Sequence, residues 1–376
     1  MIVDERVDTG EPAVLSPLGV GPSPDDDHLP TSSPRRLVAY AVGVTAFAVV
    51  FVPMARDAGA GVWSGSIALG LAFALVAVGV YLTFRVLDFP DLTVDASFPA
   101  GAAIAALLLT DGHSAWWTLP AAFAVGSLFG ALTGLLHIAL RINSLLASIL
   151  TVTAAFTINL RIQGSANVSL LGVDTMYTTF ADPVRDTLES WFGATGLQIH
   201  RNVVTATVAL VVLIVAIVLL DLFFRSEVGV ALRATGANRR MSRAQGIDTR
   251  VYLIGGVALS NALIAVSGAL VAQHQGFADV SSGAGLIIAG LAAVIIGEVL
   301  FAGRSQAMWR HLVAASLGMV LYRSVIGVML ATDIDLPMVA AWRLEPTDLR
   351  LATAVVVALL LAVPRVRAMR SRTARR

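Results

Sequence analysis

Only a few charged side chains interrupt the long apolar runs of this 376-residue sequence, and these groups are the first candidates for chemistry. Glu298 lies deep in the apolar run 284–302. An ionised side chain inside such a run is costly unless it is paired or hydrated. Glu298 is therefore expected either to line a polar path or to pair with an arginine such as Arg304 or Arg323.

Three aspartates, Asp88, Asp91 and Asp95, follow the apolar run 66–87 at short spacing. Asp and Pro in this stretch favour a defined turn. An aspartate just before a helix can accept hydrogen bonds from the free N–H groups of the first turn. We expect these carboxylates to cap the following helix, with contact to a soluble partner protein as the alternative.

Uncharged polar side chains occur at two further kinds of place. Asn159 and Asn261 fall within apolar runs, where an amide can hydrogen-bond between neighbouring helices. Gln273, His274 and Gln275 end another apolar run, where a solute entering the membrane would first meet them. A lone histidine is more often satisfied structurally, and no second ligand stands at metal spacing, so no metal site is predicted.

The residue types that the sequence lacks exclude several kinds of chemistry. There is no Cys, which excludes disulfides and thiolate catalysis. All 26 basic residues are Arg, and without Lys the chain has no P-loop, so it is not expected to hydrolyse ATP. Neither Gly-x-Ser-x-Gly nor His-Glu-x-x-His occurs, so we expect no enzyme activity and no cofactor in this chain. Membrane topology accounts for the arginines, and no nucleic-acid partner is expected.

The densest group of charges is the segment 225–250, which carries six arginines against two acidic residues. Small and apolar residues recur there at helical spacing, which predicts two short helices. Gly236 would end the first helix and Gly246 the second, because glycine tolerates left-handed dihedrals. The segment is interpreted either as a surface that seats in a groove of a soluble partner or as a basic loop that fixes orientation and touches lipid headgroups.

Composition indicates which elements must carry these residues. The chain is 57% hydrophobic and 14% charged, whereas soluble domains are roughly 45–50% apolar and about 25% charged. Much of its surface must face lipid, and runs that are apolar on every side indicate helices rather than barrel strands. Two runs, 96–109 and 349–363, are shorter than the ~20 residues that a crossing needs, so nine spans is the alternative to ten. The ten predicted spans are 37–54, 66–87, 96–109, 116–140, 144–160, 203–224, 251–272, 284–302, 311–330 and 349–363.

The distribution of arginine predicts the orientation. Ten spans place both chain ends on the same side as the segment 225–250, and the tail 365–376 is also rich in arginine. By the positive-inside rule this side is cytoplasmic. The tail 1–34 is acidic and rich in proline, which predicts disorder. The predicted domains are this tail, a polytopic membrane domain over 35–364 and the C-terminal tail.

Two short runs, 96–109 and 284–302, occupy matching places when spans two to five and seven to ten are taken as halves. Five spans separate the halves, so the second would be inverted relative to the first. Segments interrupted by Gly or Pro at matching places indicate a pathway at the midplane. The alternative is close packing of small residues against neighbouring helices. We thus expect an all-α integral membrane protein of about ten helices in two inverted-repeat-like halves.

Several short motifs, in this order, resemble those of a known family. They are 86–98 (VLDFPDLTVDASF), 158–162 (INLRI), 258–263 (ALSNAL), 272–280 (AQHQGFADV) and 295–298 (IIGE). Together with the arginine-rich segment they resemble the bacterial ABC importer permeases of the branched-chain amino acid and ribose type, in the branch of uncharacterised or tryptophan/tyrosine-type permeases. The resemblance covers about residues 66–330. Family members usually have Gly where this chain has Ala96, a change that would stiffen the turn.

The resemblance implies a permease subunit of the bacterial plasma membrane that forms the path for a small organic solute, an amino acid among the candidates. Its implied partners are a separate ABC ATPase that holds ATP and Mg²⁺, an extracytoplasmic solute-binding protein, a second permease copy and membrane lipid. The segment 229–247 would couple the permease to the ATPase. The residues implied in coupling are Gly229, Leu232, Arg233, Ala234, Gly236, Asn238, Arg243, Gly246 and Ile247.

A second class of function stays open at this stage. A secondary transporter or channel would use an ion gradient in place of ATP, and it would need an acid near the membrane midplane. Glu298 is the candidate coupling acid of such a protein.

Overall fold

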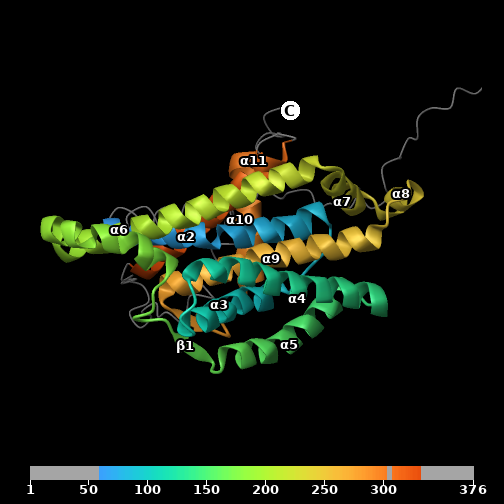
Figure 1. Ribbon diagram of the computed structural model, residues 1–376. Helices are drawn as coiled ribbons and strands as arrows, with labels where there is room; N and C mark the ends of the chain where they lie inside the picture. The colour runs from blue at the N-terminus through green and yellow to red at the C-terminus, as the bar shows by residue number, and fades with distance from the viewer. Residues whose placement is uncertain (1–58, 303–306, 332–376) are drawn as a thin grey trace, which may run out of the picture.

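The computed structural model describes residues 59–302 and 307–331, and these parts of the chain are almost entirely helical (Figure 1). Every predicted span that falls there is a helix, whereas the runs 37–54 and 349–363 and both tails lie outside the described residues. Two of the helices, Val94–Thr110 and Leu286–Phe301, are apolar but short. Within the described residues, six helices are long and apolar enough to cross a membrane: Ala60–Val86, Ala115–Leu140, Ser144–Gln163, Arg201–Arg225, Thr249–Gln275 and Met308–Ala331.

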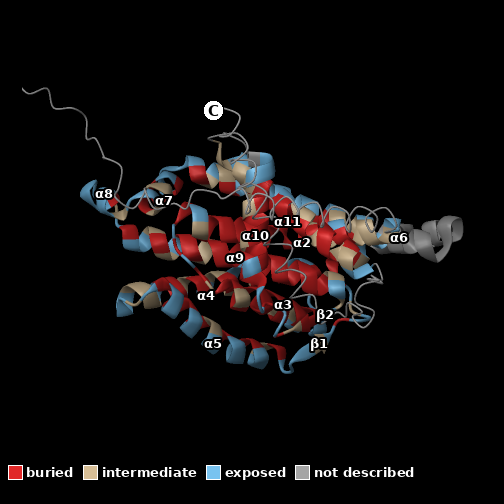
Figure 2. Cartoon of the chain, turned by 180° about the vertical axis from the view of Figure 1, so that it is seen from behind, coloured by how far each residue is buried: buried red, intermediate tan, exposed pale blue. Residues whose placement is uncertain are grey.

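Two long helices, α2 (Ala60–Tyr81) and α9 (Thr249–Gln275), form the buried centre of the bundle (Figure 2). Most of their residues are buried, whereas α5 (Ser144–Gln163) buries only a stripe of one or two residues per turn. The remaining helices of the bundle pack around this centre. They are α3 (Val94–Thr110), α4 (Thr118–Leu140, preceded by the short η3, Ala115–Trp117), α10 (Leu286–Gly297) and α11 (Met308–Ala331).

The packing of the helices follows a regular pattern. The helix α4 packs against α9, and α11 packs against α2. In the same manner α3 packs against α4 and α9, and α10 packs against α11 and α2. This is the pattern expected if α2, α3 and α4 correspond to α9, α10 and α11, so the packing supports two matched halves.

Small residues allow these helices to approach closely. A Cβ at Gly101 of α3 would overlap the backbone of Ala265 in α9, and a Cβ at Gly126 of α4 would overlap the backbone of Asn261. Contacts of this kind replace the bulky side chains that hold soluble helices apart. The close packing of small residues that the sequence offered as one interpretation of 96–109 is therefore present.

The two ends of the bundle differ. At one end, α6 (Met176–Arg225) leads into α7 (Glu227–Ala237) and α8 (Arg239–Ala244), and this is called the α7/α8 end. At the other end, β1 (Asn167–Ser169) pairs antiparallel with β2 (Phe277–Asp279), and this is called the β end (Figure 1). The helix α9 runs from the first end to the second, because α8 precedes it and β2 follows it.

Two elements depart from the predicted boundaries. The connection 161–202 between the fifth and sixth predicted spans contains β1 and the first part of α6, which begins well before its apolar run. A capping box at Thr175 and Thr178 starts the helix there. The helices α2 and α10 each end in a π-helical turn, Leu82–Val86 (η2) and Glu298–Ala302 (η4) respectively. Hydropathy alone shows neither feature.

Candidate functional site

The helix α7 lies directly against the ends of two long helices at the α7/α8 end. A Cβ on Gly229 would overlap the carbonyl of Phe223 in α6, and a Cβ on Gly236 would overlap the carbonyl of Val86 at the end of η2. Only glycine allows backbone to approach backbone so closely. The prediction that Gly236 ends the helix is therefore wrong: α7 continues to Ala237, and Gly236 is a contact point within it.

Two longer side chains of α7 add to these contacts, and one of them reaches a third helix. Leu232 is 4% exposed, and together with Leu87 it lies against Gly256 of α9. The Arg233 Nη2 donates a hydrogen bond of 3.0 Å to the carbonyl of Phe224, in the last turn of α6. A cation at a helix C-terminus also stabilises the carbonyl groups exposed there. Thus α7 touches α2, α6 and α9 together.

Well-defined caps shape the turns around α8. The Asn238 Oδ1 accepts hydrogen bonds from two N–H groups of the first turn of α8, and Asn238 itself donates its N–H to Ala234 of α7. Gly246 follows the helix with φ of 84°, a left-handed conformation that favours glycine. The N–H of Ile247 then donates to the carbonyl of Ser242. The sequence prediction of a stop at Gly246 is confirmed.

Side chains of α8 tie it to its neighbours. The Arg243 Nε donates a hydrogen bond of 3.1 Å to the Thr249 hydroxyl in the first turn of α9. The Arg239 Nη2 lies 3.5 Å from the carbonyl of Asp88, in the turn after η2. Asp88 has a φ of 48°, which aspartate tolerates better than most residues. These contacts fix α8 beside the start of α9.

The other side of this segment is exposed. Val230 of α7 and Met241 of α8 are 48% and 61% exposed, and Arg240 between them in sequence is also exposed. Large apolar side chains with arginines beside them are typical of protein-binding surfaces. We call Val230, Arg240 and Met241 the exposed face of the coupling segment. All nine residues implied in coupling lie in this segment: Gly229, Leu232, Arg233, Ala234, Gly236, Asn238, Arg243, Gly246 and Ile247.

A fully buried polar group, which we call the polar junction, lies where α3 begins. The Asp91 carboxylate accepts hydrogen bonds from the Thr93 N–H at 2.8 Å and from the Asn261 Nδ2 of α9 at 2.7 Å. The Ser97 hydroxyl donates to the Asn261 Oδ1 at 2.7 Å. Both oxygens of the buried carboxylate thus have a donor, which offsets much of the cost of removing its charge from water.

The polar junction continues into α4 and α5. The Thr93 and Thr133 hydroxyls lie 2.7 Å apart, and the Thr133 hydroxyl donates to that of Thr151 at 2.9 Å. The Asn159 Nδ2 of α5 donates to the carbonyl of Ala96 at 3.1 Å. The sequence analysis missed the threonines, because each lies on a different element and they face one another only once the helices are packed.

Asp95 caps a helix that is distant in the sequence. Its carboxylate accepts hydrogen bonds from the N–H groups of Gly285 and Ile287 at the start of α10, at 3.0 and 3.1 Å. Pro99 has no N–H to donate to the Asp95 carbonyl one turn earlier, and Gly283 packs closely against that carbonyl. The sequence predicted a cap on the following helix, and the structure shows a cap on α10 that joins the starts of the two short helices.

Glu298 is paired, but with an arginine other than those expected. The Arg85 Nε in η2 donates to both carboxylate oxygens of Glu298 in η4, each at 3.0 Å. Of the expected partners, Arg304 lies outside the described residues, and Arg323 lies over the ring of Phe73. The ion pair joins the two π-helical turns, so it locks the ends of α2 and α10 together at the α7/α8 end.

The polar residues that end α9 have different surroundings. Gln273 is buried, with its Oε1 accepting from the Met176 N–H and its Nε2 donating to the Thr118 hydroxyl, both at 3.0 Å. Its side chain therefore joins α9 to α6 and α4, and both of its polar atoms are already engaged by the protein. Gln275 is exposed, and His274 faces a pocket that is described next.

A polar pocket of about 430 Å³ opens at the β end. It lies between the start of α2, the middle of α6, the end of α9 and the second half of α11, and it contains two arginines, Arg201 and Arg323. We call it the outer pocket. Its lining residues are Gly61, Val62, Gly65, Ser66, Leu69, Arg201, Asn202, His274, Arg323, Ile326, Gly327 and Leu330.

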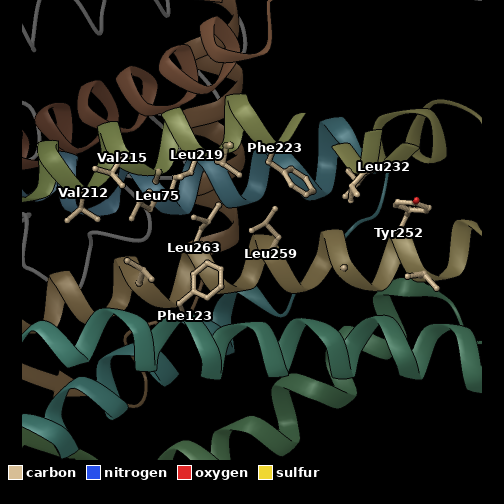
Figure 3. Close-up of a pocket in the computed structure, with 16 residues that line it drawn as sticks. Leu75, Phe123, Val212, Val215, Leu219, Phe223, Leu232, Tyr252, Leu259 and Leu263 are labelled. Atoms are coloured by element: carbon tan, nitrogen blue, oxygen red, sulfur yellow. The ribbon is translucent and has the colours of Figure 1, made fainter. Parts of the chain in front are cut away.

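A second cavity, of about 540 Å³, lies between α6 and α9 and is nearly devoid of polar groups (Figure 3). Val215, Leu219 and Phe223 line it from α6, and Leu259 and Leu263 line it from α9 (Figure 3). Such a surface suits an apolar occupant but offers no group to recognise a polar solute.

Comparison with known proteins assigns the family. The model of the family described as "Branched-chain amino acid transport system / permease component" matches residues 63–364. This chain belongs to that family. Its members are permease subunits of ABC transporters, and the chain is accordingly a multi-pass protein of the cell membrane.

Several curated permeases are similar to it. The "Tyrosine transport system permease protein" of Clostridioides difficile is 32% identical over 292 residues, which cover 78% of this chain and 88% of the relative. The probable branched-chain amino acid permease LivH of Methanocaldococcus jannaschii is 26% identical, with coverage of 73% and 89%. The ribose import permease RbsC of Escherichia coli is 26% identical, with coverage of 61% and 67%. No solved structure matches this chain.

The contact between α7 and η2 gives a first prediction. Gly236→Ala should lower the free energy of unfolding by about 1–3 kcal/mol, because the added methyl group overlaps the Val86 carbonyl. Gly255→Ala in α9 is the matched control, since a Cβ there meets open space. Unfolding of the purified protein in detergent by increasing SDS measures both. Equal stability of the two variants would show that α7 does not depend on this contact.

The polar junction gives a second prediction. Asn261→Leu should lower the free energy of unfolding by about 3–5 kcal/mol, because it leaves the buried Asp91 carboxylate without one of its donors. The control is Asp88→Asn, which keeps the left-handed turn and removes only an exposed carboxylate. The same SDS titration compares them, and a loss below about 1 kcal/mol for Asn261→Leu would contradict a tightly coupled junction.

Proposed function

We propose that this chain is the transmembrane permease subunit of an ATP-driven importer and that the segment 229–247 receives force from a separate ABC ATPase. The observation that carries the proposal is the position of α7, which contacts α6 and the end of η2 through backbone and contacts α9 through the buried side chain of Leu232. Any displacement of α7 must therefore displace at least one of these helix ends.

The route from α7 to the membrane interior is short. The helices α2 and α9 form the buried centre, and α9 carries Asn261, which holds the start of α3 through Asp91. Asp95 then joins α3 to α10. Closely packed elements of this kind move between discrete arrangements rather than deform continuously. A shift at α7 would in this way reach both short helices, which end within the bundle.

The remaining parts of the transporter follow from the chemistry that the chain lacks. With no Lys the chain holds no P-loop, so ATP and Mg²⁺ belong to the partner ATPase. The α7/α8 end, which carries the arginine-rich segment 225–250, would face the cytoplasm together with both termini. A solute-binding protein would then dock at the β end, and a second permease copy would complete the path. Two inverted halves agree with the packing of α2, α3 and α4 against α9, α10 and α11, and we propose ten spans in all.

The names of the similar permeases narrow the class of solute. Relatives named for tyrosine, branched-chain amino acid and ribose transport are all similar to this chain, with the highest identity of these three to the tyrosine permease. We propose a small organic solute with an amino acid as the leading candidate.

Glu298 argues against the secondary-transporter alternative. A coupling acid must exchange its ion during each cycle, whereas both oxygens of Glu298 are engaged by Arg85. The pair also joins two helix ends and has no contact with the outer pocket. We assign Glu298 a structural role in the permease.

The exposed face of the coupling segment provides the test. The double variant Val230→Glu with Met241→Glu should abolish stimulation of the partner ATPase by the permease, because it places charge on apolar side chains that a partner would bury. The protein should still insert and fold, since both residues are about half exposed or more. ATP hydrolysis by the reconstituted complex measures the effect.

Leu171→Glu serves as the control for that experiment. Leu171 is 83% exposed but lies near β1, at the opposite end of the bundle. Its substitution should leave ATP hydrolysis unchanged. Full stimulation by the double variant would exclude this face as the docking site of the ATPase.

A further inference from the structure

The outer pocket contains an arginine whose charge has no counter-ion among the described residues. The Arg323 Cζ lies 3.4 Å from the centroid of the Phe73 ring, so the guanidinium is held against an aromatic face. Its Nε is buried and has no hydrogen-bond partner in this part of the chain. Phe73 in turn stacks on Phe98 of α3, with the ring centroids 5.2 Å apart. The stack fixes the position of the guanidinium without neutralising it.

The rest of the pocket adds positive charge and no negative charge. Arg201 also lines it, and neither arginine forms an ion pair with any described residue. His274 faces the same space, and its Nδ1 lies 3.1 Å from the Thr205 hydroxyl. The twelve lining residues include no Asp or Glu. An uncompensated cation within a membrane protein is costly, and it is retained where it binds something.

We propose that the outer pocket binds the carboxylate of the transported solute and that Arg323 is the residue that recognises it. This inference rests on the proposed function, because it takes the β end as the side from which solute arrives. A guanidinium can bind a carboxylate through two parallel hydrogen bonds, which are stronger than bonds between neutral groups. The carboxylate would also supply the negative charge that the pocket lacks.

The dimensions and the chemistry of the pocket favour a solute with a carboxylate over a neutral sugar. A volume of about 430 Å³ admits a small organic molecule. A neutral sugar would leave the guanidinium of Arg323, whose Nε is buried, uncompensated, whereas a carboxylate removes that cost. Arg323 would thus select the solute by charge rather than by shape.

Binding of matched probes to the full-length protein in lipid nanodiscs tests the proposal. L-Tyrosine and 4-hydroxyphenylpropionate both carry a carboxylate, whereas tyramine lacks it, and D-ribose represents the sugars. We expect the two carboxylates to bind and tyramine and ribose not to bind. Arg323→Gln should weaken L-tyrosine binding by roughly 10- to 100-fold, the effect of losing charge-assisted hydrogen bonds. Arg323→Lys should restore part of the affinity.

Arg310→Gln is the matched control, since Arg310 lies on the same helix but is exposed and outside the pocket. Its affinity for L-tyrosine should equal that of the unaltered protein. Arg201→Gln, which alters the second arginine, is expected to weaken binding by a few-fold, and it keeps the test open if Arg323→Gln fails to fold.

Several outcomes would overturn the inference. They are binding of tyramine or ribose as strong as that of L-tyrosine, failure of both carboxylates to bind, or unchanged affinity in Arg323→Gln. If Arg323→Gln loses stability but keeps its affinity, the arginine pairs with the chain itself. Each of these results leaves ATPase stimulation through Val230 and Met241 intact, so it is distinguishable from failure of the proposed function.

Discussion

Direct contact between backbones at the end of the bundle is the constraint on which the rest of the structure depends. Gly229 and Gly236 bring α7 against α6 and η2 without a side chain between them, and Leu232 adds α9. A longer residue at either glycine would separate α7 from the helices. Because these contacts are direct, a partner ATPase that displaced α7 and α8 would also displace the membrane helices that they touch.

Inside the bundle, two short helices must begin where little water is available. Each begins with N–H groups that need acceptors. Asp91 serves the start of α3 and Asp95 serves the start of α10, and Asn261 ties the first of them to the central helix α9. Of the acidic residues that interrupt the apolar sequence, Asp95 caps α10, Asp91 joins the turn before α3 to α9, and Glu298 pairs with Arg85.

Much of this could be predicted from the sequence, and the exceptions have physical reasons. Apolar runs predict the helices because lipid demands them, and Gly246 predicts a helix end because it adopts a left-handed conformation. Gly236 was misinterpreted because a glycine that permits close approach looks the same as one that ends a helix. The pairing of Glu298 with Arg85 joins residues 213 positions apart, and the outer pocket combines four helices, so neither could be inferred without the packing.

The most direct test of the account asks which side of the membrane α8 faces and what covers it. The chain contains no Cys, so Met241→Cys introduces a single thiol at an exposed position. A membrane-impermeant maleimide should label this thiol in inside-out vesicles and not in intact cells, and addition of the partner ATPase should protect it. Labelling in intact cells, or labelling that the ATPase leaves unchanged, would contradict the assignment of α7 and α8 as the segment that receives force from the motor.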